Sequence, residues 1–207
     1  MLTGTQSYAS GIGVSGGATL QTDPAVITTS TLAIDSASAL QAAAGDLFKL
    51  TGDFLSHSTQ SATWNTAAAT LQFTGGGSHT MLLTGIDLGA RPAVAAHNFS
   101  WGAVVIDAGD VLSLGDGLDD PLAHVALYVG DLVGALIVGD DVTNIFGNGY
   151  DIYYDPFAAE NAYLGGRTYQ LADDGGWLVA VPAPAPLAVL VPGLAFLLRI
   201  KRKRLYS

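Results

Sequence analysis

The sequence predicts an all-β protein, with a β-solenoid or β-sandwich-like body followed by a short C-terminal hydrophobic helix. Between Gly11 and about Gly117, short apolar or β-branched runs alternate with clusters of Gly, Ser, Thr and Asp, which are strand and turn signals. Glu160 is the only glutamate among the 18 acidic residues. Because aspartate favours turns and disfavours helix interiors, few long helices are expected.

Six apolar runs mark the expected strands of the first half of the chain. They are Ala18–Leu20, Leu32–Ile34, Leu47–Leu50, Leu71–Phe73, Met81–Leu83 and Val104–Ile106. Their spacing of about 10 to 20 residues suits the rungs of a β-solenoid or a sandwich of short strands. A single rung cannot cover its own apolar face and becomes stable only when stacked on neighbours. We therefore favour the solenoid over the sandwich.

Three later segments are predicted individually. Ser36 to Ala44 has the composition of a short helix ending at Gly45, or of a rung with small inward residues. Gly130-Asp131 is expected to form a turn between two buried strands, Val125–Val129 and Leu132–Val138, instead of lying in a membrane span. Asn148-Gly149 is a turn signal, and Thr168–Leu171 is expected to form a hairpin with Trp177–Val181.

Charge and cysteine content exclude several classes of function. The net charge is −10, and five of the eight basic residues lie between Arg199 and Arg204. Residues 1–198 therefore carry about −15, a charge that repels phosphate backbones and argues against nucleic-acid binding. The chain has no cysteine, which excludes disulfides, thiolate metal sites and a cysteine nucleophile.

The C-terminal segment is organised in three parts after the acidic all-β body of residues 1–180. Residues 181–186 form a proline-rich spacer, because prolines fix φ and donate no hydrogen bond. Residues 187–207 hold an apolar segment and a basic end. The apolar segment is shorter than the roughly 20 residues that span a bilayer. Its apolar residues are Leu187, Val189, Leu190, Leu194, Phe196, Leu197 and Leu198. The basic residues are Arg199, Lys201, Arg202, Lys203 and Arg204, and they are expected on the cytoplasmic side with the body outside.

This order of parts resembles the PEP-CTERM sorting tail of Gram-negative bacteria. The sorting motif corresponds to Val181, Pro182, Ala183 and Pro184, with Ala183 where the family has its glutamate. The resemblance implies that exosortase, a membrane-embedded transpeptidase, recognises Pro182-Ala183-Pro184 and processes the chain. An ordinary tail anchor is the alternative.

The resemblance also implies a location. The protein would be exported, tethered to the inner membrane by its tail, and then delivered to the cell surface or extracellular matrix. A structural or adhesive role follows from that location. Residues Met1–Ser10 lack the charged and apolar parts of an export leader, so we expect the reading frame to begin further upstream.

The acidic turns offer one candidate metal site. Asp116, Asp119 and Asp120 could supply oxygen ligands for calcium, although they match neither an EF-hand loop nor a calcium-binding roll. We favour the interpretation that these aspartates shape turns. No other cofactor is expected. The histidines His57, His79, His97 and His124 lack the paired spacing of a zinc site and are expected to be incidental.

Two alternatives to a structural role involve extracellular polysaccharide as the partner. A carbohydrate-binding module would use exposed aromatic side chains, although aromatics more often fill a core. The aromatic candidates are Trp64, Phe99, Trp101, Tyr150, Tyr153, Tyr154, Tyr163, Tyr169 and Trp177. A β-helix polysaccharide-active enzyme would pair Glu160 with an aspartate, and an acidic substrate would require Lys49, Arg91 or Arg167. We expect the protein not to be an enzyme.

Overall fold

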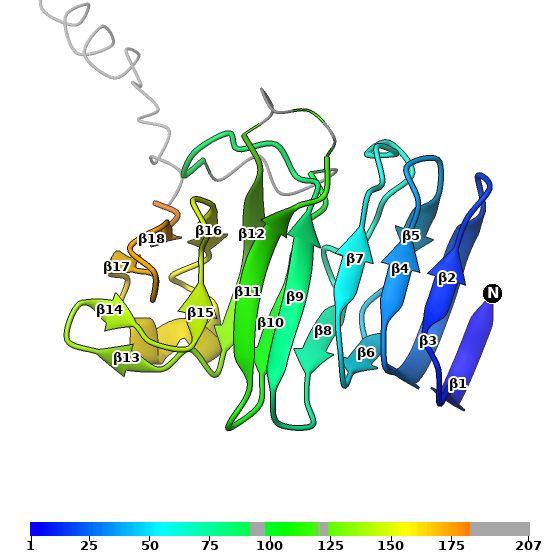
Figure 1. Ribbon diagram of the computed structural model, residues 1–207, viewed down its shortest axis with the longest axis horizontal. Helices are drawn as coiled ribbons and strands as arrows, with labels where there is room; N and C mark the ends of the chain where they lie inside the picture. The colour runs from blue at the N-terminus through cyan, green and yellow to red at the C-terminus, as the bar shows by residue number, and fades with distance from the viewer. Residues whose placement is uncertain (92–97, 119, 121–123, 183–207) are drawn as a thin grey trace, which may run out of the picture.

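The computed structural model describes residues 1–91, 98–118, 120 and 124–182, and it confirms the all-β prediction. The chain winds into successive coils whose strands fall into two facing sheets, stacked from β1 at one end to β17 and β18 at the other (Figure 1). The helical element of the described residues is a short 3-10 helix, η1 (Ala159–Leu164).

The large sheet contains one strand from each coil, and its pairing includes antiparallel strands at the C-terminal end. Its order is β1 (Leu2–Ser7), β3 (Thr19–Thr29), β6 (Leu47–Leu50), β8 (Thr70–Phe73), β10 (Trp101–Ile106), β12 (Ala126–Val133), β16 (Asp151–Tyr154), β18 (Trp177–Ala180), β17 (Tyr169–Gln170), β14 (Asp141–Val142) and β13 (Ile137–Val138). Strand β5 (Ala39–Gln41) pairs with the first residues of β3.

The small sheet is formed by the second strand of each coil. Its order is β2 (Ile12–Val14), β4 (Leu32–Ile34), β7 (Phe54–Ser56), β9 (Ser78–Leu83), β11 (Val111–Asp116) and β15 (Ile145–Phe146). Every neighbouring pair in this sheet is parallel.

Parallel register distinguishes the solenoid from the sandwich. In the large sheet Val26 pairs with Leu47, Leu47 pairs with Thr70 and Thr70 pairs with Ala103. Each strand therefore lies beside the chain roughly 20 to 33 residues further on, the period of a repeat that stacks on its neighbours. The body is a β-solenoid, the architecture that the sequence favoured.

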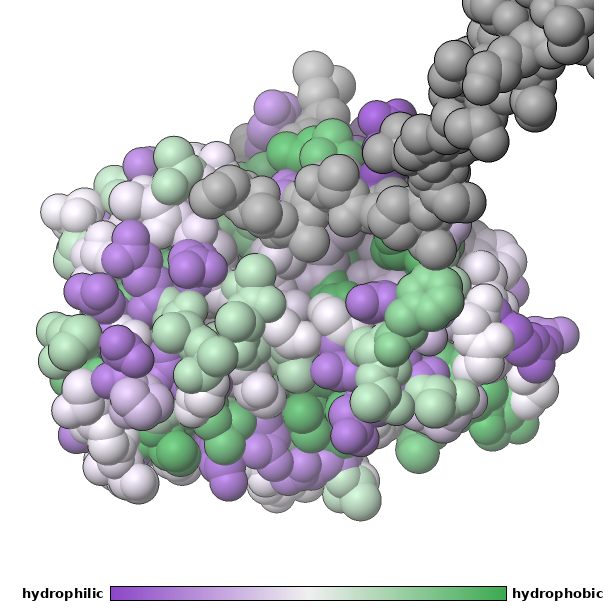
Figure 2. Space-filling view, turned by 180° about the vertical axis from the view of Figure 1, so that it is seen from behind, coloured by the Kyte–Doolittle hydropathy of each residue, from purple (hydrophilic) through white to green (hydrophobic). Residues whose placement is uncertain are grey.

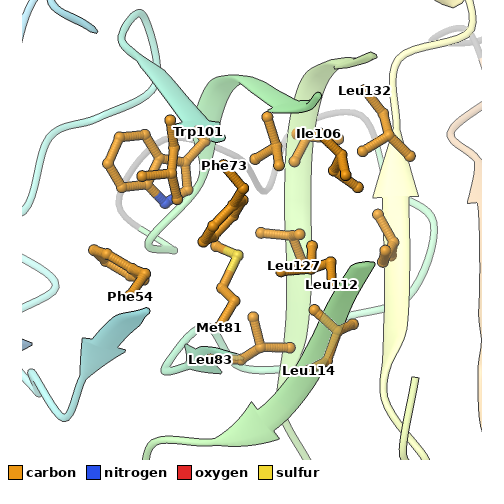
Figure 3. Close-up of a cluster of buried hydrophobic side chains, with 14 of the residues drawn as sticks. Phe54, Phe73, Met81, Leu83, Trp101, Ile106, Leu112, Leu114, Leu127 and Leu132 are labelled. Carbon is orange, nitrogen blue, oxygen red and sulfur yellow. The ribbon is translucent and has the colours of Figure 1, made fainter. Parts of the chain in front are cut away.

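The core fills the space between the two sheets. Alternate strand residues point inward, so β6 buries Phe48 and Leu50 while Leu47 and Lys49 are only partly buried. Trp101 lies at the centre, where it meets the edges of the Phe48 and Phe54 rings at centroid distances of 5.9 and 5.5 Å. Figure 3 shows side chains of both sheets meeting there. Each fully buried aliphatic or aromatic side chain contributes roughly 1.5–3 kcal/mol.

The segment from Ser36 to Ala44 is a rung and contains no helix. Its central residues form β5, which pairs with β3 through Thr19↔Ala39 and Leu20↔Leu40. Ser38, Ala39 and Ala42 are buried, as expected for the alternative in which small residues point inward.

The predicted turn at Gly130-Asp131 is wrong. Both residues lie inside β12, which runs unbroken to Val133 and ends at Gly134, where φ is +88°. Gly130 is required by a close approach of two backbones, since a Cβ there would lie 2.5 Å from the carbonyl oxygen of Gly102. The glycine therefore indicates tight packing of neighbouring coils and no change of chain direction.

The C-terminal end of the solenoid is closed by antiparallel strands. Tyr169 pairs with Leu178 and Gln170 with Trp177, which confirms the predicted hairpin. The predicted turn at Asn148-Gly149 is also present. The predicted hydrophobic helix and basic end lie outside the described residues, and no helix within the described ranges is long and apolar enough to cross a membrane.

Candidate functional site

Val181, the first residue of the predicted sorting motif, is bonded to the body. Strand β18 pairs in parallel with β16, and Val181 extends this pairing by donating its N–H to the carbonyl oxygen of Tyr154 at 2.9 Å. The next residue, Pro182, is exposed and has no N–H to donate. The other motif residues, Ala183 and Pro184, lie outside the described part of the chain, as does the whole of residues 187–207.

The side chain of Val181 packs on a second, smaller apolar cluster, separate from the core. This outer cluster consists of Ala126, Tyr128 and Tyr153, with Ala90, Val179 and Val181 packed against them. Tyr128 of β12 and Tyr153 of β16 are register partners and stack with a centroid distance of 4.9 Å and an interplanar angle of 23°. Cross-strand aromatic pairs of this kind stabilise neighbouring strands.

The two tyrosine hydroxyls bind the loop of residues 86–91 to the outer cluster. The hydroxyl of Tyr128 accepts the N–H of Leu88 at 2.8 Å and donates to the carbonyl oxygen of Gly89 at 3.1 Å. The hydroxyl of Tyr153 donates to Oδ1 of Asp87 at 3.0 Å. That loop and the start of the tail therefore share one anchoring surface.

The chemistry of the outer cluster is that of an anchor. Burial raises the pKa of the Tyr128 hydroxyl, and burial and the hydrogen bond to Asp87 raise the pKa of Tyr153. Both hydroxyls are therefore neutral in the physiological range and act as hydrogen-bonding groups instead of nucleophiles.

The predicted calcium ligands are only partly described. Asp116 ends β11, and its Oδ1 accepts the N–H of Leu118 at 2.7 Å. Asp120 is described, whereas Asp119 lies outside the described residues. Among the residues that the structure covers, no group of three or more His, Asp and Glu side chains could hold a metal ion.

Several aspartates hold neighbouring coils together. Their carboxylates accept a backbone N–H from an adjacent coil: Asp46 from Ala25 at 2.6 Å, Asp53 from Thr80 at 2.7 Å and Asp173 from Gly147 at 2.9 Å. The Asp46 carboxylate is 1% exposed and also accepts the hydroxyl of Thr22 at 2.8 Å. These bonds stabilise the stacking because they satisfy amide groups that the sheets leave unpaired.

His79 and Asp110 form a buried pair between β9 and the start of β11. Nε2 of His79 lies 3.1 Å from Oδ1 of Asp110, and the two side chains are 2% and 0% exposed. Nδ1 of His79 lies 2.7 Å from the carbonyl oxygen of Gly52, which can only accept, so Nδ1 carries a proton. The contact with Asp110 lacks the alignment of a hydrogen bond, and neither oxygen of that carboxylate has a hydrogen bond in the described part of the chain. The two side chains form a buried polar contact, and His79 is a core histidine, one of the two incidental roles that the sequence predicted for it.

Most of the candidate sugar-binding aromatics are buried in the core or, for Tyr153, in the outer cluster. Trp64, Trp101, Tyr153, Tyr154 and Tyr169 are each at most 6% exposed, and Phe99 and Tyr150 pack against the core cluster. Two candidates remain open to solvent, Tyr163 at 45% and Trp177 at 47%. Figure 2 shows the opposite face of the molecule from Figure 1, where hydrophilic and hydrophobic residues are intermixed.

Two of the residues proposed for a polysaccharide-active enzyme, Glu160 and Arg167, are exposed in the C-terminal part of the solenoid. Glu160 is exposed on η1, and its backbone N–H donates to Oδ1 of Asp131 at 3.2 Å. Arg167 pairs with Asp140 and lies over the Tyr169 ring at 5.3 Å. An interior cavity of about 10 Å³, lined by Trp64, Phe99 and neighbouring core residues, has room for no more than one water molecule.

The sequence did not predict the roles of Tyr128 and Asp87. Tyr128 belongs to the outer cluster on which Val181 packs, and Asp87 accepts the hydroxyl of Tyr153 in the same cluster. Their local sequence gives no signal, because each acts through a partner far along the chain. A solenoid register would have supplied the missing information by placing Tyr128 beside Tyr153.

Comparison with known proteins adds no assignment. The chain matches no protein-family model, no curated protein and no solved structure.

Proposed function

We propose that this chain is an exported surface or extracellular-matrix protein with a structural or adhesive β-solenoid body. A PEP-CTERM-like tail that exosortase processes would deliver it. The calcium site at Asp116, Asp119 and Asp120 is not needed for this role.

The observation that supports the proposal is the environment of the first two motif residues. Val181 is hydrogen-bonded to Tyr154 and packed on the outer cluster, whereas Pro182 is exposed. The motif Val181–Pro184 therefore begins directly after β18, which ends at Ala180. A processing enzyme would need access to an extended segment next to the body, and prolines at 182, 184 and 186 keep such a segment extended.

The body supports a structural role. Two stacked sheets bury a continuous core along the coils, and aspartates such as Asp46 and Asp173 link neighbouring coils. Its acidic charge keeps an extended, exposed protein soluble.

The first experiment removes residues 183–207 and leaves Val181 and Pro182 in place, so that the last rung stays intact. The protein is expressed behind an export leader in a host that has exosortase. We expect the truncated protein to reach the periplasm but to lose attachment. Unchanged export and anchoring would contradict the tail interpretation.

The second experiment separates a sorting tail from an ordinary anchor. The double substitution of Pro182→Ala and Pro184→Ala is compared with Pro156→Ala, a proline in the body. In a host with exosortase, we expect the intact mass of the protein to show a shortened chain for the wild type and for Pro156→Ala, but not for the double variant. An ordinary anchor would give full-length chains in every case, with or without exosortase.

The carbohydrate-binding alternative now depends on the exposed aromatics Trp177 and Tyr163. Glycan-array binding should be lost in Trp177→Ala if these rings form a stacking platform. Leu136→Ala is the matched control, because Leu136 is 55% exposed and also lies in the C-terminal part of the solenoid. Absence of binding by the wild-type protein removes this alternative.

A further inference from the structure

Asn148-Gly149 is the one Asn-Gly pair of the chain, and it lies in the turn between β15 and β16. The φ angles of Asn148 and Gly149 are +52° and +94°, and both residues are exposed to solvent. The N–H of Tyr150 donates to the carbonyl oxygen of Gly147 at 2.9 Å. Two central residues with positive φ and a closing hydrogen bond identify a type I′ turn.

An asparagine followed by glycine can react with its own backbone. The nitrogen of Gly149 bonds to Cγ of Asn148, the bond from Cγ to Nδ2 breaks, and ammonia leaves with the proton of the attacking nitrogen. Water then opens the resulting five-membered imide. Cleavage between the imide nitrogen and Cγ gives aspartate, whereas cleavage at the backbone carbonyl gives isoaspartate, in which the main chain runs through the side chain. Gly149 has no Cβ to hinder the approach of its nitrogen.

The folded turn keeps the two reacting atoms apart. In the left-handed conformation, the nitrogen of the next residue lies opposite the side chain across the Cα–C bond, so ring closure requires rotation about this bond in Asn148. The N–H of Gly149 is bonded to the carbonyl oxygen of Gly175, and the N–H of Asn148 donates to Oδ2 of Asp173 at 2.6 Å. Gly175 and Asp173 lie in the turn that joins β17 to β18. The last hairpin therefore holds the reactive pair in its closed conformation.

The side chain of Asn148 is held by a second element. Its Nδ2 donates to the carbonyl oxygen of Leu114 at 2.7 Å and to Oγ of Ser113 at 2.9 Å, and both residues belong to β11. A carbonyl oxygen can only accept, so the group that faces Leu114 is the NH₂ of the amide. Asn148 thus links β11 to the last hairpin through its side chain and its backbone N–H.

Deamidation would break this link. The NH₂ donor is replaced by a carboxylate oxygen that faces the Leu114 carbonyl, which is also an acceptor, so a hydrogen bond is lost and two acceptors repel each other. The new charge would lie on the residue whose N–H is bonded to the Asp173 carboxylate. Isoaspartate also lengthens the main chain within the turn, which displaces the N–H of Gly149 from Gly175. Either product opposes the return of the last hairpin.

We propose that Asn148 is a deamidation site that the last hairpin keeps closed and that reacts when this hairpin detaches. The product weakens the attachment of the hairpin, so a transient opening at the C-terminal end becomes a lasting change of the protein. Local opening of this kind is common at the ends of folded units. The proposal is independent of the tail and of its processing.

The rate of deamidation in the folded protein is the first measurement. Full-length protein in detergent and a synthetic peptide of residues 145–152 are incubated in the same mildly alkaline buffer, and peptide mass spectrometry follows Asn148. We expect the folded protein to react at least about tenfold more slowly than the peptide, since several hydrogen bonds must break before the ring can close. In urea the protein should react at the rate of the peptide. Equal rates without urea, or no reaction in urea, overturns the proposal.

A variant that loosens the hairpin is the second measurement. Asp173→Asn removes the carboxylate that accepts the N–H of Asn148, so deamidation of Asn148 in the folded protein should become several-fold faster. Asp141→Asn is the matched control, because Asp141 is an exposed aspartate of β14 in the same part of the solenoid. Equal rates in the two variants would exclude control by the hairpin.

The effect of the product is tested by introducing it directly. Asn148→Asp should melt at a lower temperature than the wild-type protein. Asn65→Asp is the control, because Asn65 is exposed and its side chain forms no hydrogen bond within the described residues, so its melting temperature should stay close to that of the wild type. If both variants melt like the wild type, deamidation leaves the hairpin attached and the proposed lasting change does not occur.

Discussion

Nε2 of His79 lies 3.1 Å from Oδ1 of Asp110 in the core between β9 and β11, with both side chains almost completely buried. Removing the carboxylate leaves the Nε2 nitrogen of His79 buried without its polar neighbour. Asp110→Ala should therefore lower the free energy of unfolding by about 1–3 kcal/mol, as measured by denaturant unfolding.

Two further variants make that prediction specific. The double variant with His79→Leu and Asp110→Ala should lose less stability than the sum of its single substitutions, because neither polar group is then left buried alone. His57→Leu is the matched control. His57 makes a similar contact, with Nδ1 2.8 Å from the Gly117 carbonyl oxygen, but it is exposed and should matter little. Strict additivity of the two core substitutions would contradict a coupling between His79 and Asp110.

Tyr128→Phe keeps the ring stack and removes the two hydrogen bonds to the loop of residues 86–91. We expect a loss of about 0.5–1.5 kcal/mol for each hydrogen bond. The change should be local, so amide exchange at Leu88 should accelerate while that of Leu112 in the small sheet should not. Unchanged exchange at Leu88 would show that the loop is held by other contacts.

Acid should weaken the linkage between coils that Asp173 provides. Partial burial of this carboxyl acts to raise its pKa, but the N–H groups of Asn148 and Gly147 outweigh burial and lower the pKa below the ordinary 3.8. Because its pKa is lower in the folded protein than in the unfolded chain, Asp173 stabilises the fold fully when the pH is above the pKa of the unfolded chain. This contribution is lost as the pH falls through the pKa of the folded protein.

The corresponding measurement is the melting temperature between neutral pH and acid. Asp173→Asn should melt lower than wild type at neutral pH, and the two curves should begin to converge as the pH falls below about 4 and meet below the lowered pKa of the folded state. Parallel curves across this range would exclude a contribution from ionised Asp173.

Base should destabilise the protein through Tyr154. Burial raises the pKa of this tyrosine from 10.0 to about 12, and its hydroxyl donates to the Arg167 carbonyl oxygen at 2.6 Å. Tyr154 contributes its full stabilisation when the pH is below the tyrosine pKa of the unfolded chain. This stabilisation is lost as the pH rises from about 10 to about 12. Tyr154→Phe should therefore show a weaker fall of the melting temperature with pH in this range. An identical slope in the variant would contradict this prediction.

Gly134→Ala should prevent the normal fold. Gly134 has φ of +88°, and a Cβ on it would collide with the carbonyl oxygen of Ile106. Gly16→Ala is the control, because Gly16 has φ of +71° but open space around it, so only the backbone penalty of about 1–2 kcal/mol applies. Yield of folded protein and circular dichroism distinguish the two. Equal stability of both variants would show that the coil at Ile106 can shift to make room.

The local sequence was sufficient to predict where many of the strands lie. Leu32–Ile34 and Leu47–Leu50 were predicted with their observed boundaries because inward and outward residues alternate along each of them and turn residues flank them. Ser36–Ala44 stayed ambiguous, because its small residues suit a helix as well as a rung.

The local sequence could not predict which strands pair with one another. Tyr128 and Tyr153 are far apart along the chain, and their contact depends on the lengths of the coils between them. Gly130 was misread as a turn residue because its requirement arises from Gly102 on the neighbouring coil. Of the candidate functional residues in the C-terminal segment, Val181 and Pro182 follow β18 directly, whereas Ala183–Ser207 lie outside the described residues.

The hydrogen bond from Val181 to Tyr154 determines how the molecule would carry a mechanical load. A force applied through Pro182 reaches this bond first and then the short pairing of β18 with β16. Because each coil contacts mainly its neighbours, a solenoid under tension yields coil by coil from the point of attachment. The outer cluster adds resistance at this first point, since pulling Val181 away also exposes the faces of Tyr128 and Tyr153.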